Sequence, residues 1–319
     1  MSTFNFVGID IAKDKFDVAF RKGENFKHRQ FTNDSSGFEA FTDLLKQISL
    51  PWIVMEATGH YGEALAEHLY DKKICVSVVN PRQVKDFARA KMTRNKNDVV
   101  DARVIASYGE SMKPRTFEPS SESEKELKSL VNLLETLKKQ IVQLKNQLAS
   151  VRGKIAKEAL EKIIRELAVK ISEIEKAIQE LIEKDKGMKD QAMLLKTIKG
   201  VGELTINKIL AYGNVNSYQK AKQFAASIGI TPMHHQSGTM TGRTTISKQG
   251  DSNLRKAFYM AALVAMRFNP VLKTFAERLK RAGKAPKSVI CAVMRKLAHI
   301  IFGVLKNAQP FDPAFSLKT

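Results

Sequence analysis

Two long heptad series in the middle of the chain constrain the fold more than any other feature. Apolar residues recur with alternating spacings of three and four over 127–151 and again over 160–181, with charged residues between them. This pattern is typical of coiled-coil helices. The register breaks over 152–157, around Gly153, which predicts a hinge or turn. The two helices could pair with each other, with another protomer, or both, so their expected role is oligomerisation or spacing.

The segments on either side of the heptads differ from them and from each other. We expect two strands within 4–20 and one strand each at 51–56 and 74–79. We expect helices at 37–48, 61–72, 81–91 and 97–111. Strands alternating with helices favour an α/β domain with a mixed sheet. The last third reads as helices at 252–267, 270–281 and 286–306 after a long loop at 231–250. We therefore predict three domains, 1–118, 119–186 and 187–319, the third mostly α-helical.

Charge gives the first indication of a partner. The 319 residues include 53 Lys and Arg against 33 Asp and Glu, a formal net charge of +20 that is spread along the chain. Such an excess favours nucleic acid through phosphate contacts, although a merely basic protein is the alternative. Charged residues interrupt the apolar helices, so no membrane span is expected. The two cysteines lack metal-type spacing, and the N-terminus lacks a signal-peptide layout, which together favour the cytoplasm.

Four carboxylates stand where a metal site could form. Asp10 lies within the first apolar strand, Glu56 ends the strand at 51–56, and Asp98 and Asp101 lie on one face of the helix expected at 97–111. A carboxylate among β-branched residues is costly to bury without a partner such as a cation. If the four converge, they make an all-oxygen site suited to Mg²⁺ or Mn²⁺. The alternative is four separate structural acids at a turn, a strand end and a helix cap.

A glycine turn at 194–212 predicts a helix-hairpin-helix. Gly200 and Gly202 would let the backbone approach a phosphate, and the following helix N-terminus would offer free N–H groups. Lys196, Lys199 and Lys208 add positive charge there. The expected contact is independent of nucleic-acid sequence. An ordinary glycine turn remains the alternative.

The segments GIDIAKDKFDV, MEATGHY and RNKNDVVDAR resemble the N-terminal domain of insertion-sequence transposases of the IS110 family. The likeness continues through the heptads into the C-terminal domain and so spans nearly the whole chain. It implies an RNase H-like, RuvC-like domain whose D-E-D-D acids are Asp10, Glu56, Asp98 and Asp101, holding Mg²⁺ or Mn²⁺.

The resemblance also implies that Ser237, in an SG pair of the long loop, is a nucleophile that attacks a phosphodiester. From the residues alone Ser237 is a turn serine, and Ser247 and Ser252 are rival hydroxyls. His234 and His235 are candidates for proton transfer or phosphate contact. The candidate phosphate-binding cations of this region are Arg243, Lys248 and Arg255.

The family implies a transposase that acts on donor and target DNA, in many members guided by a structured bridge RNA. We expect a homo-oligomer, a dimer or tetramer, in which the acids of one protomer could meet the serine of another. DNA-inverting relatives share this architecture, so inversion stays open. Two further alternatives are a Holliday-junction nuclease that uses metal-activated water and an architectural nucleic-acid-binding protein without enzymatic activity.

Overall fold

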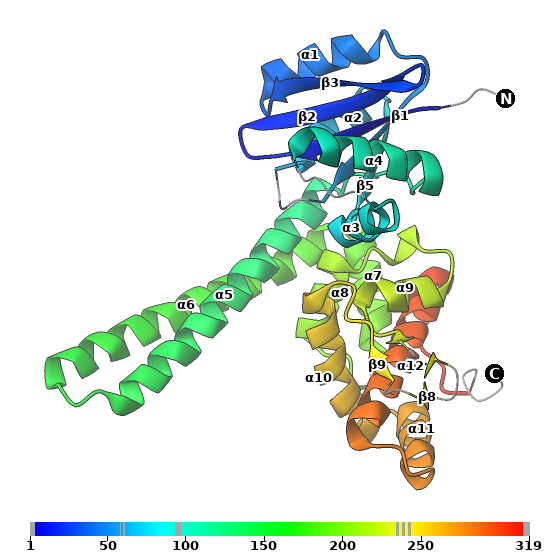
Figure 1. Ribbon diagram of the computed structural model, residues 1–319. Coiled ribbons are helices and arrows are strands. Elements are labelled where there is room, and N and C mark those ends of the chain that lie inside the picture. Colours follow the sequence, from blue (N-terminus) through cyan, green and yellow to red (C-terminus); the bar gives the residue numbers. More distant parts are fainter. Residues whose placement is uncertain are drawn as a thin grey trace. The chain divides into compact units, whose positions relative to one another are not determined.

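The computed structural model describes residues 4–57, 59, 61–92, 97–233, 236–237, 240–241 and 244–314. The chain forms two compact units, Met1–Ser120 and Ser121–Thr319. Figure 1 shows the helices and strands of these units with their labels.

A five-stranded mixed sheet forms the centre of the N-terminal unit, in the order β3-β2-β1-β4-β5. The strands are β1 (Asn5–Ile11), β2 (Lys15–Lys22), β3 (Asn25–Thr32), β4 (Pro51–Glu56) and β5 (Cys75–Val79). Strand β2 runs antiparallel to both β1 and β3, whereas β1, β4 and β5 are parallel. The predicted α/β class with a mixed sheet is confirmed. Strand β3 was not predicted, because an edge strand buries little surface and its polar sequence, NFKHRQFT, lacks an apolar stripe.

Helices cover both faces of this sheet (Figure 1). On one face, α1 (Ser35–Leu45) and α2 (Glu63–Asp71) bury their apolar stripes against β1, β2 and β4. On the other face lie α3 (Pro81–Ala90) and α4 (Asp98–Met112), packed on Phe6, Val54 and Val79. Helix α4 approaches β1 closely at Gly8, where an added Cβ would lie 2.1 Å from the carbonyl oxygen of Ala102. Only glycine allows this contact, which fixes α4 over the end of the sheet that carries the predicted acids.

The C-terminal unit begins with a helical hairpin made by α5 (Glu122–Ser150) and α6 (Lys154–Lys184). Ser121 starts α5 with a capping box, and the turn between the helices falls at the predicted register break. Leu127, Leu134 and Ile178, near the base of the hairpin, are buried in the same core as the helices that follow. The two predicted helices are therefore confirmed, and of the pairings left open the structure shows the one between the two helices themselves. Their coiled-coil geometry stays a prediction.

Seven shorter helical segments complete this unit: α7 (Lys186–Lys196), α8 (Glu203–Tyr212), the 3-10 turn η1 (Val215–Ser217), α9 (Ala221–Ile228), α10 (Ser252–Phe268), α11 (Pro270–Arg281) and α12 (Pro286–Asn307). The long loop contains two small antiparallel pairs, β6 (Pro232–Met233) with β9 (Thr245–Ile246), and β7 (Gln236–Ser237) with β8 (Met240–Thr241). Since the hairpin base and these helices share one core, the compact unit starts at Ser121. The further division at residue 186 stays a prediction.

Helix α12 is long and apolar enough to cross a membrane by its length and composition. Half of its most apolar stretch is buried inside the unit, where the helix contacts α7, α9, α10 and α11. Its apolar residues therefore form the centre of a helical core, and this packing explains its composition.

Candidate active site

Asp10 and Glu56 lie at the carboxyl ends of neighbouring parallel strands. The register pairs Ile9 of β1 with Met55 of β4, and both of these side chains are buried beneath α1 and α2. Because side chains alternate along a strand, the next residues, Asp10 and Glu56, face the opposite side of the sheet, which α3 and α4 cover. Both are half-buried. The structure thus places these two acids beside each other on one face.

Helix α4 brings the other two acids to the same end of this face. It runs antiparallel to β1: Gly109 packs on Phe6, whereas Ala102 and Ala106 pack on Gly8. One helical turn before Ala102, the start of α4 therefore lies at the level of Asp10. Asp98 and Asp101 occupy that first turn, which the Asn97 side chain caps by accepting a hydrogen bond from the Val100 N–H at 2.8 Å.

The four carboxylates share one end of the sheet without closing into a compact cluster. Among the residues that the structure describes, no three His, Cys, Asp or Glu side chains are grouped closely enough to hold a metal ion. Asp101 is half-buried, while the Asp98 side chain is 57% exposed. The donor chemistry nevertheless fits a hard divalent cation, since every candidate ligand is a carboxylate oxygen.

A fifth acid, Asp17, was missed by sequence reasoning. It pairs in register with Asp10 across β1 and β2 and is 3% exposed. The His28 Nε2 atom lies 2.6 Å from its Oδ1, and the Gln30 amide donates to both of its oxygens at 3.1 Å. The sequence of β2 contains a signal for this acid. Phe16 and Val18 are apolar and share one face of the strand, so Asp17 between them lies on the other face.

Lys15 connects Asp17 with the start of α4. Its Nζ lies 3.1 Å from Asp98 Oδ2 and 3.6 Å from Asp17 Oδ2. The hydrogen bond to Asp98, followed by the charge of Asp17, raises the pKa of Lys15 above its ordinary value. A cation is therefore already attracted to this end of the sheet.

Ser237 lies in β7, where its backbone pairs with that of Met240 in β8. The β6–β9 pair forms the base of this segment, joining Pro232 to Ile246 and Met233 to Thr245. His234, His235 and Arg243 lie outside the described residues. Of the rival hydroxyls, Ser247 Oγ accepts a hydrogen bond from the Gln249 N–H at 3.4 Å, and Ser252 is the first residue of α10.

The predicted helix-hairpin-helix corresponds to α7, a short turn and α8, but its residues divide between two tasks. Gly200 has a φ of +102°, and an added Cβ would lie 2.6 Å from the Ala265 Cα of α10. Its task in the structure is close helix packing. Gly202, by contrast, precedes α8 with no atom within 4 Å of an added Cβ.

The cations of this motif divide in the same way. Lys196 and Lys199 are exposed. Lys208 forms an ion pair with Glu135 of α5 and is only 14% exposed, so its charge joins α8 to the hairpin.

Arg255 donates from Nη1 to the carbonyl oxygens of Ile228, at 2.9 Å, and Gly250, at 3.2 Å, which gives this residue a structural task as well. Lys248 is exposed.

Comparison with known proteins identifies relatives of the whole chain. A family model described as "Transposase", for DEDD transposases of the IS110 group, matches residues 7–152. A second, described as "Transposase IS116/IS110/IS902 family", matches residues 192–277. The pilin gene-inverting protein of Moraxella bovis is 32% identical over 96% of this chain and 97% of its own length. The transposase for insertion sequence element IS1328 of Yersinia enterocolitica is 24% identical over 98% of this chain and all of its own length.

Proposed function

Because the chain belongs to the IS110 family of transposases and DNA-inverting proteins and is a DNA recombinase, we propose that it cuts and rejoins DNA with a carboxylate-held metal ion and a serine nucleophile. The observation that carries the proposal is the placement of Asp10 and Glu56 on adjacent parallel strands beneath the start of α4.

Asp10, Glu56, Asp98 and Asp101 would hold the metal ion. Membership of the DEDD transposases supports the use of a divalent metal, and the all-carboxylate donor set favours Mg²⁺ or Mn²⁺ over softer metals. When bound, such an ion supplies charge neutralisation and polarisation at the scissile phosphate. The sheet framework is the arrangement expected of an RNase H-like, RuvC-like domain, which we propose for this unit. Lys15 would have to release Asp98 when the ion binds.

Ser237 would carry the covalent step. Its oxygen forms a bond to the phosphorus of the scissile phosphodiester while the bond from that phosphorus to the leaving sugar oxygen breaks. The serine proton passes to a nearby base, for which His234 and His235 are candidates, and the leaving oxygen takes up a proton. Attack by a hydroxyl of the partner strand then reverses these bond changes and frees the serine. One phosphodiester replaces another, so no external energy source is needed.

The acids and the serine belong to different compact units, and we propose that they meet in an oligomer, a dimer or tetramer, with each half supplied by a different protomer. The hairpin of α5 and α6 would connect the protomers as a coiled coil. Mixing Asp10→Ala protein with Ser237→Ala protein should then restore part of the recombination activity that each variant lacks. Absence of recovery at every mixing ratio would contradict a shared site.

Donor and target DNA are the proposed substrates, and a structured guide RNA is a further proposed partner. The net charge of +20 supports polyanionic partners in general. Exposed Lys196, Lys199 and Gly202 on the α7–α8 motif are the best-placed of the predicted contacts for a sugar–phosphate backbone. The cytoplasm is the proposed location.

Inversion of a DNA segment is the second candidate function. Its support is the greater identity to the pilin gene-inverting protein of Moraxella bovis, 32%, than to the IS1328 transposase, 24%. Both reactions use the same cutting and joining chemistry. The DNA flanking the gene distinguishes them, since element ends indicate a mobile element and a bounded invertible segment indicates inversion.

A trapped protein–DNA adduct tests the chemistry. With labelled substrate and Mg²⁺, denaturing electrophoresis should show DNA attached to the wild-type protein. The adduct should be absent from Ser237→Ala and from Asp10→Ala, whereas Ser247→Ala and Ser252→Ala should retain it. Cleavage without any adduct would instead indicate hydrolysis by metal-activated water, as in a Holliday-junction nuclease. DNA binding without Mg²⁺-dependent cleavage or joining would indicate an architectural protein.

A further inference from the structure

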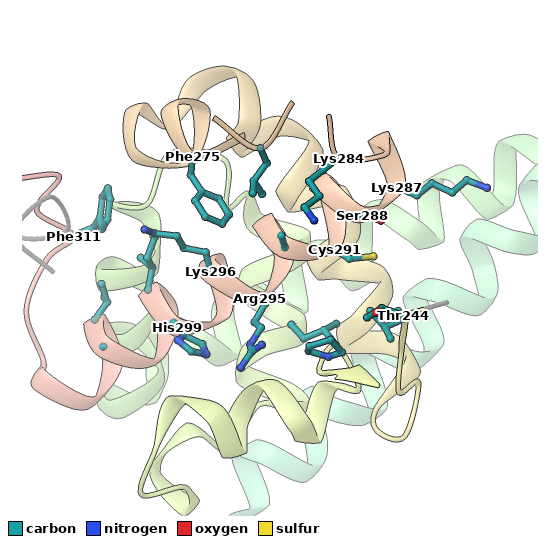
Figure 2. Close-up of a pocket in the computed structure, with 18 of the residues that line it drawn as sticks. Thr244, Phe275, Lys284, Lys287, Ser288, Cys291, Arg295, Lys296, His299 and Phe311 are labelled. Atoms are coloured by element: carbon teal, nitrogen blue, oxygen red, sulfur yellow. The ribbon is translucent and has the colours of Figure 1, made fainter. Parts of the chain in front are cut away.

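A large groove in the C-terminal unit lies along α12 (Figure 2). Its walls come from α11, α12, the β6–β9 pair and residues 309–312, and its volume is about 1170 Å³. Small-molecule sites usually measure roughly 300–1,000 Å³. We call this space the α12 groove. Its size suits a segment of an extended ligand.

Charge selects the chemistry of that ligand. The described lining contains four cationic side chains and a single carboxylate, that of Asp312. The four cations are Lys284, Lys287, Arg295 and Lys296. Because so little acidic charge balances them, the groove favours an anion, and its length favours a chain of anionic groups over an isolated ion.

Aromatic and apolar side chains lie between these cations. Phe275 of α11 is half-buried, and the Lys296 Nζ lies 5.0 Å from the centre of its ring (Figure 2). Leu279, Ile300 and Phe311 add further apolar surface. Proteins that bind single-stranded nucleic acid combine the same two elements, since bases stack on aromatic rings while cations follow the phosphates. Double-stranded DNA hides the faces of its bases and could use only the cations.

His299 is a further polar side chain of the groove lining. Its Nε2 is buried and makes no hydrogen bond within the protein. Burial, together with the charges of Arg295 and Lys222, lowers the pKa of His299, so the ring is neutral near pH 7. The neutral ring adds no positive charge, so the lysine and arginine side chains set the charge of the groove.

The position of the groove relates it to the proposed nucleophile. Pro232 of β6 and Thr245 and Ile246 of β9 line it, and these strands pair at the base of the segment that carries Ser237. We propose that the α12 groove binds an unpaired segment of the DNA strand on which Ser237 acts. This inference rests on the proposed function, because strand exchange requires the strands to separate.

Fluorescence anisotropy with unpaired and duplex DNA of one sequence tests the proposal. All proteins carry Ser237→Ala, so that no cutting occurs and binding is measured apart from chemistry. Phe275→Leu retains apolar volume without a ring to stack on, and should weaken binding of unpaired DNA about tenfold. The double variant Lys284→Gln, Lys296→Gln should weaken it too, and should reduce the slope of log affinity against log salt by about 1.4. Duplex binding should change less in Phe275→Leu, because only unpaired bases can stack on the ring.

The matched control is Lys273→Gln, Lys280→Gln, which removes the same charge from exposed positions of α11 outside the groove. It should leave the preference for unpaired DNA unchanged. An equal loss in the control and the groove variants would overturn the proposal, as would an equal loss for duplex and unpaired DNA in Phe275→Leu. An RNA oligonucleotide that alone responds to the groove variants would overturn the assignment to DNA.

A second measurement needs no substitution in the groove. Cys291 lines it, and Cys75 is the other cysteine of the chain. In protein carrying Cys75→Ser and Ser237→Ala, unpaired DNA should slow labelling of Cys291 by a maleimide severalfold, while the same amount of duplex should protect less. Unchanged labelling at saturating unpaired DNA would contradict the proposal. Such a result would leave the adduct assay unaffected, so failure of this inference and failure of the proposed chemistry are distinguishable.

Discussion

His299 is the residue whose environment departs most clearly from what its sequence position suggests. It occurs in an apolar helix, where a histidine is expected to satisfy its ring within the core, yet its buried Nε2 has no hydrogen-bond partner. Burial and the nearby charges of Arg295 and Lys222 lower its pKa below the ordinary value of 6.5. The folded protein therefore resists protonating this ring.

The lowered pKa of His299 predicts a pH dependence of stability. Below about pH 6.5 the unfolded chain binds a proton that the folded chain does not, so the free energy of unfolding should decrease as the pH falls from 7 towards 5. Urea titrations at several pH values should show a flatter dependence for His299→Gln than for the wild type. His28→Gln tests whether the effect is specific, and an unchanged slope in His299→Gln would contradict the prediction.

Asp17 and Lys15 show that the role of a residue depends on the partners that the fold brings to it. In sequence they are two members of a charged stretch beside a strand. In the structure Asp17 is buried across from Asp10, and Lys15 lies between it and Asp98. Sequence reasoning found Asp10 because an isolated acid in an apolar strand is conspicuous. It missed Asp17 because the burial of that acid depends on polar partners supplied by β3, His28 and Gln30.

At the scale of elements, the α7–α8 motif separates packing from binding. The sequence suggests the same role for Gly200 and Gly202. The structure distinguishes them, since Gly200 contacts the backbone of α10 and Gly202 faces open space. Sequence cannot make this distinction, because α10 begins some fifty residues later and its approach is a tertiary contact.

Alanine substitutions at these glycines should therefore have opposite consequences. Gly200→Ala forces a Cβ into Ala265 at a φ of +102°, and should lower the free energy of unfolding by about 2–5 kcal/mol. Gly202→Ala should cost only about 1 kcal/mol, because alanine is a poorer N-cap than glycine, yet it should weaken DNA binding if the backbone here meets a phosphate. Chemical denaturation and DNA titration of both variants provide the measurement. A stable Gly200→Ala protein would refute the packing argument, and full DNA affinity in Gly202→Ala would remove this turn from the DNA contacts.

The heptad helices show the reliability of a strong periodic signal. Their lengths and the turn between them follow from a repeat that few other structures can use, whereas the repeat left their pairing partner open and the structure shows contact between the two helices. The burial of individual heptad positions does not follow from the repeat. Leu127, Leu134 and Ile178 are buried in a core shared with later helices, whereas Leu148 towards the turn is only half-buried. The repeat specifies an apolar seam, and only the surrounding helices decide which part of the seam is covered.

At the scale of the whole molecule, metal binding should appear as stabilisation. A ligand that binds only the folded state raises stability by about 2.7 kcal/mol when its concentration is one hundred times Kd. Excess Mg²⁺ should therefore raise the thermal midpoint of the wild type, and EDTA should reverse the effect. Asp10→Asn and Glu56→Gln, which remove one charge each with little change of shape, should lose most of the response. Asp14→Asn, an exposed acid of the neighbouring turn, is the control.

The same shift in wild type and Asp10→Asn would show that Mg²⁺ stabilises the protein elsewhere. No shift in the wild type at any concentration would contradict a metal site in the free protein, and would leave an ion that binds only together with DNA. Isothermal titration with Mn²⁺ in the presence of DNA distinguishes these outcomes. The adduct assay reports separately on Ser237.

Local sequence patterns establish the α/β unit from alternating strands and helices, the two long helices from the heptads, and Asp10 as an acid within an apolar strand. Tertiary structure alone decided which polar groups meet. Asp10 faces Asp17 because of strand register, Lys208 is engaged by Glu135 from a distant helix, and the α12 groove exists because α11, α12 and the β6–β9 pair diverge. Periodicity records which face of an element is apolar, but the contacts between faces depend on segments far apart in the chain, and no local pattern encodes them.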